Sequence, residues 1–212
     1  MAVDRVPSAR ALARKETTRY SGAEAIHTGG KRLGRTVGDF WAWSTSDLLD
    51  NTARGVLAEF LVGLAVGAPL DGVREEWAPF DLEADGIKIE VKSAAYVQRW
   101  TQRKLSSIVF RVPKTLPWDA DAGTSGTEPG RQADVYVFAL LGHRDKSTID
   151  PLNVAQWEFY ALSRKTLDER RRSQHSITLR SLRSLAGPAV PFEGLGAKVK
   201  QVYGAGDGRA PD

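Results

Sequence analysis

Residues 79–92, PFDLEADGIKIEVK, decide the fold that we expect for this chain. From Ile87 to Val91, apolar and charged residues alternate, which is the period-two pattern of a strand with two distinct faces. The dipeptide Asp85-Gly86 directly precedes this strand and is a strong signal for a two-residue hairpin turn. The stretch therefore predicts a β-hairpin whose two strands pair around Asp85-Gly86.

Pairing around this turn sets two carboxylates opposite each other. Glu83 faces Lys88, and two residues further from the turn Asp81 faces Glu90. Like charges placed directly opposite destabilise a sheet, so positive charge is needed beside them. Lys92 projects from the same face as Glu90 and supplies one such charge. A divalent cation would supply the rest, and carboxylate oxygens suit Mg²⁺ or Mn²⁺.

A third carboxylate lies upstream, in a stretch that we expect to be a helix from about Asp47 to Val66. Apolar residues recur there at three- and four-residue spacing, which is typical of a helix that packs on a core. Glu59 is the only charged residue of segment 56–66. Burying it without a partner would be costly, so we predict that Glu59 reaches the same site as the hairpin carboxylates.

Together, Glu59 on a helix, Asp81 on a hairpin and the triplet Glu90-Val91-Lys92 resemble the PD-(D/E)XK, or restriction-endonuclease-like, nuclease superfamily. The resemblance covers roughly residues 47–141. It implies an α/β fold with a restriction-endonuclease-like α-β-β-β-α-β core, in which a mixed central sheet is flanked by helices. The expected core elements are helix 47–66, strands near 73–78, 80–84 and 86–93, and a second helix for which 94–105 is a short candidate.

The resemblance also implies a metal-dependent nuclease that hydrolyses phosphodiester bonds, and a role for each site residue. Asp81 and Glu90 would ligate Mg²⁺ or Mn²⁺, joined by the Val91 carbonyl and by Glu59, directly or through water. The ion would polarise the scissile phosphate and lower the pKa of a bound water. Lys92 would orient that water and stabilise the charge that develops at phosphorus. Gln98 is a further catalytic candidate, because it follows the catalytic strand closely.

Basic residues favour an anionic partner, in agreement with a formal net charge of +4. Two groups are candidates to contact a nucleic-acid backbone, and a solvated basic surface without a ligand is the alternative for both. The first group follows the motif and the second lies in the arginine-rich stretch 164–183: Arg99, Arg103 and Lys104, then Arg170, Arg171 and Arg172.

Composition changes along the chain predict three parts. We expect a basic, loosely ordered arm over residues 1–36, the nuclease domain over 37–200 and a flexible Gly-rich tail over 201–212. Within the domain, further strands are expected at 106–112, 133–141 and 157–162, with a surface loop over 113–132. Trp77 and Trp157 are expected in the core, whereas Trp100 and Trp118 are candidates to stack on bases.

The sequence excludes several other classes of protein. It contains no Cys, which rules out disulfide scaffolds, thiol nucleophiles and zinc knuckles. No apolar run approaches the ~18 residues of a membrane span, and the first residues contain no apolar block of the kind found in signal peptides. These features predict a cytoplasmic protein that does not enter a membrane.

DNA is the expected substrate, in a restriction, defence or repair role. Many members of the superfamily cleave both strands as dimers, so a homodimer is expected, and a methyltransferase, a helicase or another defence-system component is the expected functional partner. One alternative is a nuclease-like fold that binds nucleic acid or protein without cleaving. Another is an RNA-binding module or ribonuclease, although the aromatic motifs of common RNA modules are absent.

Overall fold

The computed structural model describes residues 14–119 and 122–207. Its elements, in chain order, are β1 (Ala25–Thr28), β2 (Lys31–Thr36), α1 (Val37–Thr45), α2 (Asn51–Val66), β3 (Leu82–Ala84), β4 (Ile87–Ala95), β5 (Val109–Arg111), β6 (Trp118–Asp119), β7 (Thr124–Ser125), β8 (Val135–Leu141), a 3₁₀ turn (Val154–Gln156), β9 (Trp157–Ser163), α3 (Arg164–Asp168), β10 (Ser176–Thr178), α4 (Leu179–Ala186) and α5 (Phe192–Asp207).

A four-stranded mixed sheet in the order β3-β4-β8-β9 forms the centre of the fold. The β3–β4 and β8–β9 pairs are antiparallel, whereas β4 and β8 are parallel. Every residue of β8 is buried, as its nearly uniform apolar sequence predicts for a strand covered on both faces. The predicted α/β class with a mixed sheet flanked by helices is therefore confirmed.

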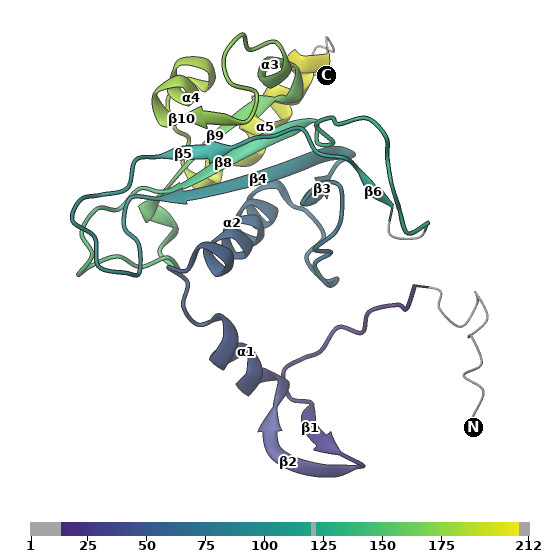
Figure 1. Ribbon diagram of the computed structural model, residues 1–212. Coiled ribbons are helices and arrows are strands. Elements are labelled where there is room, and N and C mark those ends of the chain that lie inside the picture. The colour runs from purple at the N-terminus through teal and green to yellow at the C-terminus, as the bar shows by residue number, and fades with distance from the viewer. Residues whose placement is uncertain (1–13, 120–121, 208–212) are drawn as a thin grey trace, which may run out of the picture.

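Each face of this sheet is covered by a different layer (Figure 1). One core lies between the sheet and the helices α2 and α5, and includes Ile89 and Val91 of β4. The other core includes Tyr136 and Phe138 of β8, and the β5–β10 ribbon packs on it together with α3 and α4. Glu90 and Lys92 alternate with Ile89 and Val91 along β4, so they point toward this second layer.

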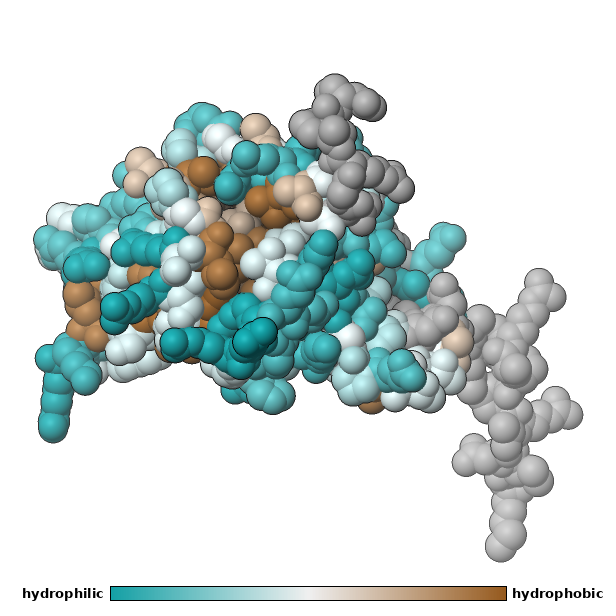
Figure 2. Space-filling model, turned by 90° about the horizontal axis from the view of Figure 1, so that it is seen from above, coloured by the Kyte–Doolittle hydropathy of each residue, from teal (hydrophilic) through white to brown (hydrophobic). Residues whose placement is uncertain are grey.

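The surface over the second layer is mostly hydrophilic, with an apolar strip near its middle (Figure 2). Arg171, Arg172 and Arg180 are among the exposed basic residues of the 164–183 stretch. None of the helices in the described ranges is long and apolar enough to span a membrane.

The N-terminal part is more ordered than the sequence predicts. Residues 25–36 form the β1–β2 hairpin, and α1 follows it directly; both project away from the sheet layers (Figure 1). Gly29 and Gly30, with φ of 53° and 86°, form the turn. The side chains of Thr36 and Asp39 cap the start of α1 reciprocally. Residues 1–13 of the predicted arm lie outside the described residues.

Several local predictions are wrong. Segment 73–78 is not a strand, and 94–105 does not form the second helix that the resemblance implies: β4 continues to Ala95, and irregular backbone follows. The connection from β4 to the parallel strand β8 contains β5, β6 and β7 in place of that helix. The specific α-β-β-β-α-β order is therefore not confirmed.

The end of the chain also differs from its prediction. Residues 201–207 continue α5 and do not form a disordered tail, because Val199, Val202 and Tyr203 pack on the core beneath the sheet. Residues 208–212 of the predicted tail lie outside the described residues. Trp157 is buried as expected, but Trp77 is exposed.

Candidate active site

The β3–β4 hairpin has the register that the sequence predicts. Leu82 pairs with Ile89, Glu83 with Lys88 and Ala84 with Ile87. Asp85 and Gly86 both adopt positive φ, 50° and 74°, which a type I′ turn requires. The pairing extends by one hydrogen bond beyond β3, from the amide of Asp81 to the Ile89 carbonyl at 3.1 Å, and this bond fixes Asp81 beside the middle of β4.

The carboxylate of Asp81 is held by the backbone of the neighbouring strand. The amide of Val91 donates to Asp81 Oδ2 at 2.7 Å. Burial and the nearby Glu90 raise the pKa of Asp81 to about 7, with a smaller contribution from Glu59, while the Val91 amide and Lys92 act in the opposite direction. Two further carboxylates therefore lie close enough to oppose the ionisation of Asp81.

Glu90 and Lys92 form an ion pair on the same face of β4. Both side chains are largely covered. Tyr136 of β8 is the register partner of Glu90, and burial together with Glu90 raises the pKa of its hydroxyl above the ordinary value. The phenol of Tyr136 is therefore protonated at neutral pH.

One cavity of about 480 Å³ brings these groups together. It is lined by Asp81, Glu90, Lys92 and Tyr136 from the sheet region. The segments 76–79, 113–118, 125 and 132 form its other walls. A charged cavity with a lysine beside two carboxylates is a suitable environment for acid–base or metal-assisted chemistry.

Glu59 lies next to this cavity and does not line it. It forms a two-point ion pair with Arg74, in which Arg74 Nη2 donates to Oε1 at 2.8 Å. Both residues line a neighbouring cavity of about 490 Å³, and Asp81 lines that cavity as well as the first. Asp81 thus stands between Glu90 on one side and Glu59 on the other. Glu59 therefore acts on Asp81 through its charge and does not share the cavity of Asp81 and Glu90, because Arg74 is paired with both of its oxygens.

The donor set at Asp81 and Glu90 fits a hard divalent cation in part. Mg²⁺ is commonly held by one or two carboxylates and several waters, and Asp81 and Glu90 can supply the two carboxylates. The amide and carbonyl of a strand residue point to the same edge, so the Val91 carbonyl is directed toward Asp81 as its amide is. Within the described ranges, however, no group of three or more His, Asp or Glu side chains is arranged to hold a metal ion.

Gln98 lies away from the cavity, beyond the carboxyl end of β4. Its side-chain amide donates to the Ala95 carbonyl at 2.9 Å and to Ser106 Oγ at 3.3 Å. Its side-chain oxygen accepts from Arg54 Nη1 at 3.5 Å. These buried contacts are those of a residue that stabilises a loop, so the catalytic role predicted for Gln98 gains no support from its position.

The first basic group lies in the same distant loop. Arg99 forms an ion pair with Asp47 at 2.6 Å, and Arg103 and Lys104 are exposed. None of these three lines the cavity of Asp81, Glu90 and Lys92.

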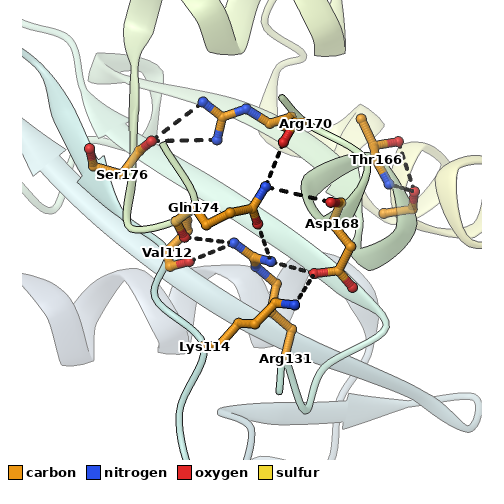
Figure 3. A network of polar contacts seen from close by, with 9 residues as sticks. Val112, Lys114, Arg131, Thr166, Asp168, Arg170, Gln174 and Ser176 are labelled. Atoms are coloured by element: carbon orange, nitrogen blue, oxygen red, sulfur yellow. Dashed lines mark hydrogen bonds and ion pairs between the residues drawn. The ribbon is translucent and has the colours of Figure 1, made fainter. Parts of the chain in front are cut away.

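The second basic group lies in the loop between α3 and β10, and none of its three arginines lines the cavity either. Arg131 anchors this loop: its buried guanidinium donates to the carbonyls of Val112 and Gln174, each at 2.8 Å, and forms an ion pair with Asp168 (Figure 3). Arg170 is half-buried and donates to the Ser176 carbonyl, whereas Arg171 and Arg172 are exposed.

This anchored loop adjoins the cavity through neighbouring residues. Pro113 and Gln132, which line the cavity, directly follow Val112 and Arg131 in the chain. Tyr136 is influenced electrostatically by Glu90 and by Arg131. Residues 169–175, which we call the arginine loop, are thus held by Arg131 beside a wall of the candidate active site.

Comparison with known protein families places this geometry in context. The model of the family described as bacteriophage T4 endonuclease IV matches residues 40–181. The chain belongs to this family. The match covers about two thirds of the 212 residues and includes Glu59, Asp81, Glu90 and Lys92. A search of curated proteins finds no match.

Membership in the endonuclease IV family indicates a nuclease, as the sequence motif predicts. The matched range begins within α1 and ends at the start of α4, so it contains the complete sheet and both candidate basic groups. Three residues of the site were not predicted from the sequence: Arg74, Arg131 and Tyr136. No local signal pointed to any of the three, because β8 is apolar throughout and the residues that contact Tyr136, Arg74 and Arg131 are distant in sequence.

Proposed function

We propose that this protein is a metal-dependent DNA endonuclease of the PD-(D/E)XK type. The observation that carries the proposal is the cavity in which Asp81, Glu90 and Lys92 meet at the centre of a nuclease-family domain. The raised pKa of Asp81 supports it, because a carboxylate whose ionisation is opposed by its neighbours is stabilised by a bound cation. Asp81, Glu90 and the Val91 carbonyl would hold Mg²⁺ or Mn²⁺, and Glu59 would contribute through water.

The roles of the protein groups follow from phosphodiester hydrolysis. When bound, the ion would supply a Lewis acid and an activated water. The Val91 amide fixes the orientation of the Asp81 carboxylate. Lys92 would donate to an oxygen of the scissile phosphate and stabilise the charge that develops there. Lys92, which is paired with Glu90, would act in positioning and charge stabilisation.

DNA would be held by its backbone at the arginine loop. Arg171 and Arg172 are exposed on a loop that Arg131 anchors, so they would contact phosphates of the DNA backbone outside the cavity. Arg99, Arg103 and Lys104 would contact a more distant stretch. We further propose that the enzyme acts in restriction, defence or repair, as a homodimer where it cuts both strands, together with a methyltransferase, helicase or similar component.

One observation favours a second candidate, a protein that binds nucleic acid without cleaving it. In the described residues Glu90 is paired with Lys92 and Glu59 with Arg74, and no three-residue metal-binding group is present. A binding module would retain the basic loop and lack metal-dependent turnover.

A cleavage assay separates these candidates. Supercoiled plasmid, duplex and single-stranded oligonucleotides and labelled RNA are incubated with Mg²⁺, Mn²⁺ or EDTA. We expect metal-dependent cleavage of DNA that falls by about 100-fold or more in Lys92→Ala and Asp81→Asn. Glu83→Gln is the matched control, because it removes an exposed carboxylate from the same hairpin.

The outcomes are distinct. Loss of cleavage in both variants, with activity kept in Glu83→Gln, supports the proposal. Cleavage that persists in EDTA, or that Asp81→Asn leaves unchanged, contradicts it. DNA binding without cleavage of any substrate under any metal supports the binding module.

A further inference from the structure

Two exposed tryptophans stand at the candidate active site. Trp77 precedes the Pro79–Asp81 segment and is 73% exposed, and Trp118 of β6 is 39% exposed. Both line the cavity that contains Asp81, Glu90 and Lys92. An indole buries a large apolar area when it has a partner, so two exposed indoles at one cavity indicate a surface that a ligand covers.

The same two side chains also line an adjoining cavity of about 760 Å³. Charges of both signs line it, from Arg14, Lys15 and Arg74 and from Glu16, Glu75 and Glu76. Trp77 and Trp118 therefore lie at the boundary between two charged cavities, one with Asp81, Glu90 and Lys92 and one with basic and acidic side chains together. Exposed indoles beside a cationic side chain such as Lys92 can bind a nucleotide, because its base stacks on the rings while its phosphate contacts the cation.

We propose that Trp77 and Trp118 form a stacking subsite for an unstacked nucleobase of the substrate strand, next to the scissile phosphate. The location of the base relative to the scissile bond rests on the proposed function, but base binding at the two indoles does not. The base comes either from a single strand or from a nucleotide turned out of a duplex, because a base inside a stacked duplex offers no free face.

Binding measurements in EDTA test this subsite without cleavage. The probes are a fluorescein-labelled 12-nucleotide single strand, the same strand with its central bases replaced by abasic sugars, and the corresponding duplex. The abasic strand has the same charge, so the ratio of the two single-strand affinities isolates base stacking from phosphate contacts. We expect Trp77→Ala and Trp118→Ala each to weaken binding of the normal strand by about 10- to 100-fold.

The controls exclude a structural explanation. Trp43→Ala removes an 84% exposed tryptophan on α1 that lines neither cavity, and is expected to bind as the wild type does. Trp77→Phe and Trp118→Phe retain an aromatic face and should recover most of the affinity. The abasic strand should bind the wild type and both alanine variants equally, which a general unfolding of the loop would not produce.

The proposal is overturned if the wild type binds the abasic strand as tightly as the normal one, or if both alanine variants retain the preference for bases. If the normal single strand binds tightly and the duplex weakly, the base comes from a single strand. If the duplex binds as tightly as the normal single strand, the base comes from a nucleotide turned out of the duplex. Failure here leaves the endonuclease proposal standing if Asp81→Asn abolishes cleavage. Conversely, base-dependent binding without cleavage supports the subsite and contradicts the catalytic proposal.

Discussion

Replacing Asp81 by Asn should make the metal-free protein more stable, with a pH dependence that the site geometry sets. An Asn side chain has the shape of Asp and its amide oxygen can still accept from the Val91 amide. It carries no charge, so it removes the repulsion from Glu90 and the burial of a charged group. The substitution thus isolates the electrostatic cost of the site from its packing.

The magnitude follows from the pKa of Asp81, which is raised from 3.8 to about 7. Between about pH 4 and pH 7 the folded protein keeps a proton that the unfolded chain has released. The free energy of unfolding therefore falls by about 1.4 kcal/mol per pH unit across that window, at most about 4 kcal/mol in all. The stabilisation that comes from protonated Asp81 is complete below about pH 4 and is lost as the pH rises through 7. Asp81→Asn has no such loss. The excess of its free energy of unfolding over that of the wild type should therefore be small at low pH and largest above pH 7.

Urea unfolding in EDTA, followed by tryptophan fluorescence at several pH values from about 4.5 to 8.5, measures this difference. Glu83→Gln serves as the control and should change the stability by less than about 0.5 kcal/mol, because Glu83 is exposed on the same hairpin. Added Mg²⁺ should stabilise the wild type and leave Asp81→Asn unchanged. A variant that is less stable than the wild type at pH 8, or a stability difference that is constant with pH, would refute the argument.

Three further predictions concern the surroundings of the site. Arg131→Met should destabilise the protein by about 3 kcal/mol in urea unfolding, because it leaves the carbonyls of Val112 and Gln174 without their buried donor. The control Arg172→Met should be within about 0.5 kcal/mol of wild type, and equal effects of the two variants would contradict the anchoring role of Arg131. Gly196→Ala should lower the free energy of unfolding by about 1–3 kcal/mol, because the new Cβ would lie 2.7 Å from the Ala65 carbonyl oxygen. In the control Gly194→Ala, on the same helix, the Cβ meets nothing nearer than 3.8 Å, so this variant should be neutral or slightly stabilised. A Gly196→Ala protein as stable as wild type would show that α2 and α5 separate readily. The double variant Arg171→Ala/Arg172→Ala should lower the slope of log affinity for duplex DNA against log salt by about 2, and an unchanged slope would remove this loop from the binding surface.

The hairpin was predictable because its signals are local. Asp85-Gly86 fixes a turn that few other dipeptides can form, and the alternation from Ile87 to Val91 fixes which side chains share a face. From these two facts the opposition of Asp81 and Glu90 follows. The burial of β8 was predictable for the same reason, since its apolar run leaves no polar face.

The contacts that the sequence did not predict join residues far apart in the chain. Glu59 was expected at a metal, but the loop after α2 brings Arg74 to it, and nothing in the spacing of these two residues indicates a pair. Gln98 was expected in a helix or loop near the site, yet β4 runs on to Ala95 and carries Gln98 past the cavity into contact with Ser106. Trp77 was expected in the core from its sequence context, and only the structure shows that it is exposed.

Anomalous diffraction from crystals soaked in Mn²⁺ tests the central claim most directly. We predict one strong Mn²⁺ peak bound by carboxylate oxygens of both Asp81 and Glu90, with the Nζ of Lys92 released from Glu90 and directed toward the solvent side of the ion. The same soak of Asp81→Asn crystals should show no peak there. An ion bound elsewhere on the protein, or an empty cavity in wild-type crystals at saturating Mn²⁺, would contradict a metal-dependent active site at these residues.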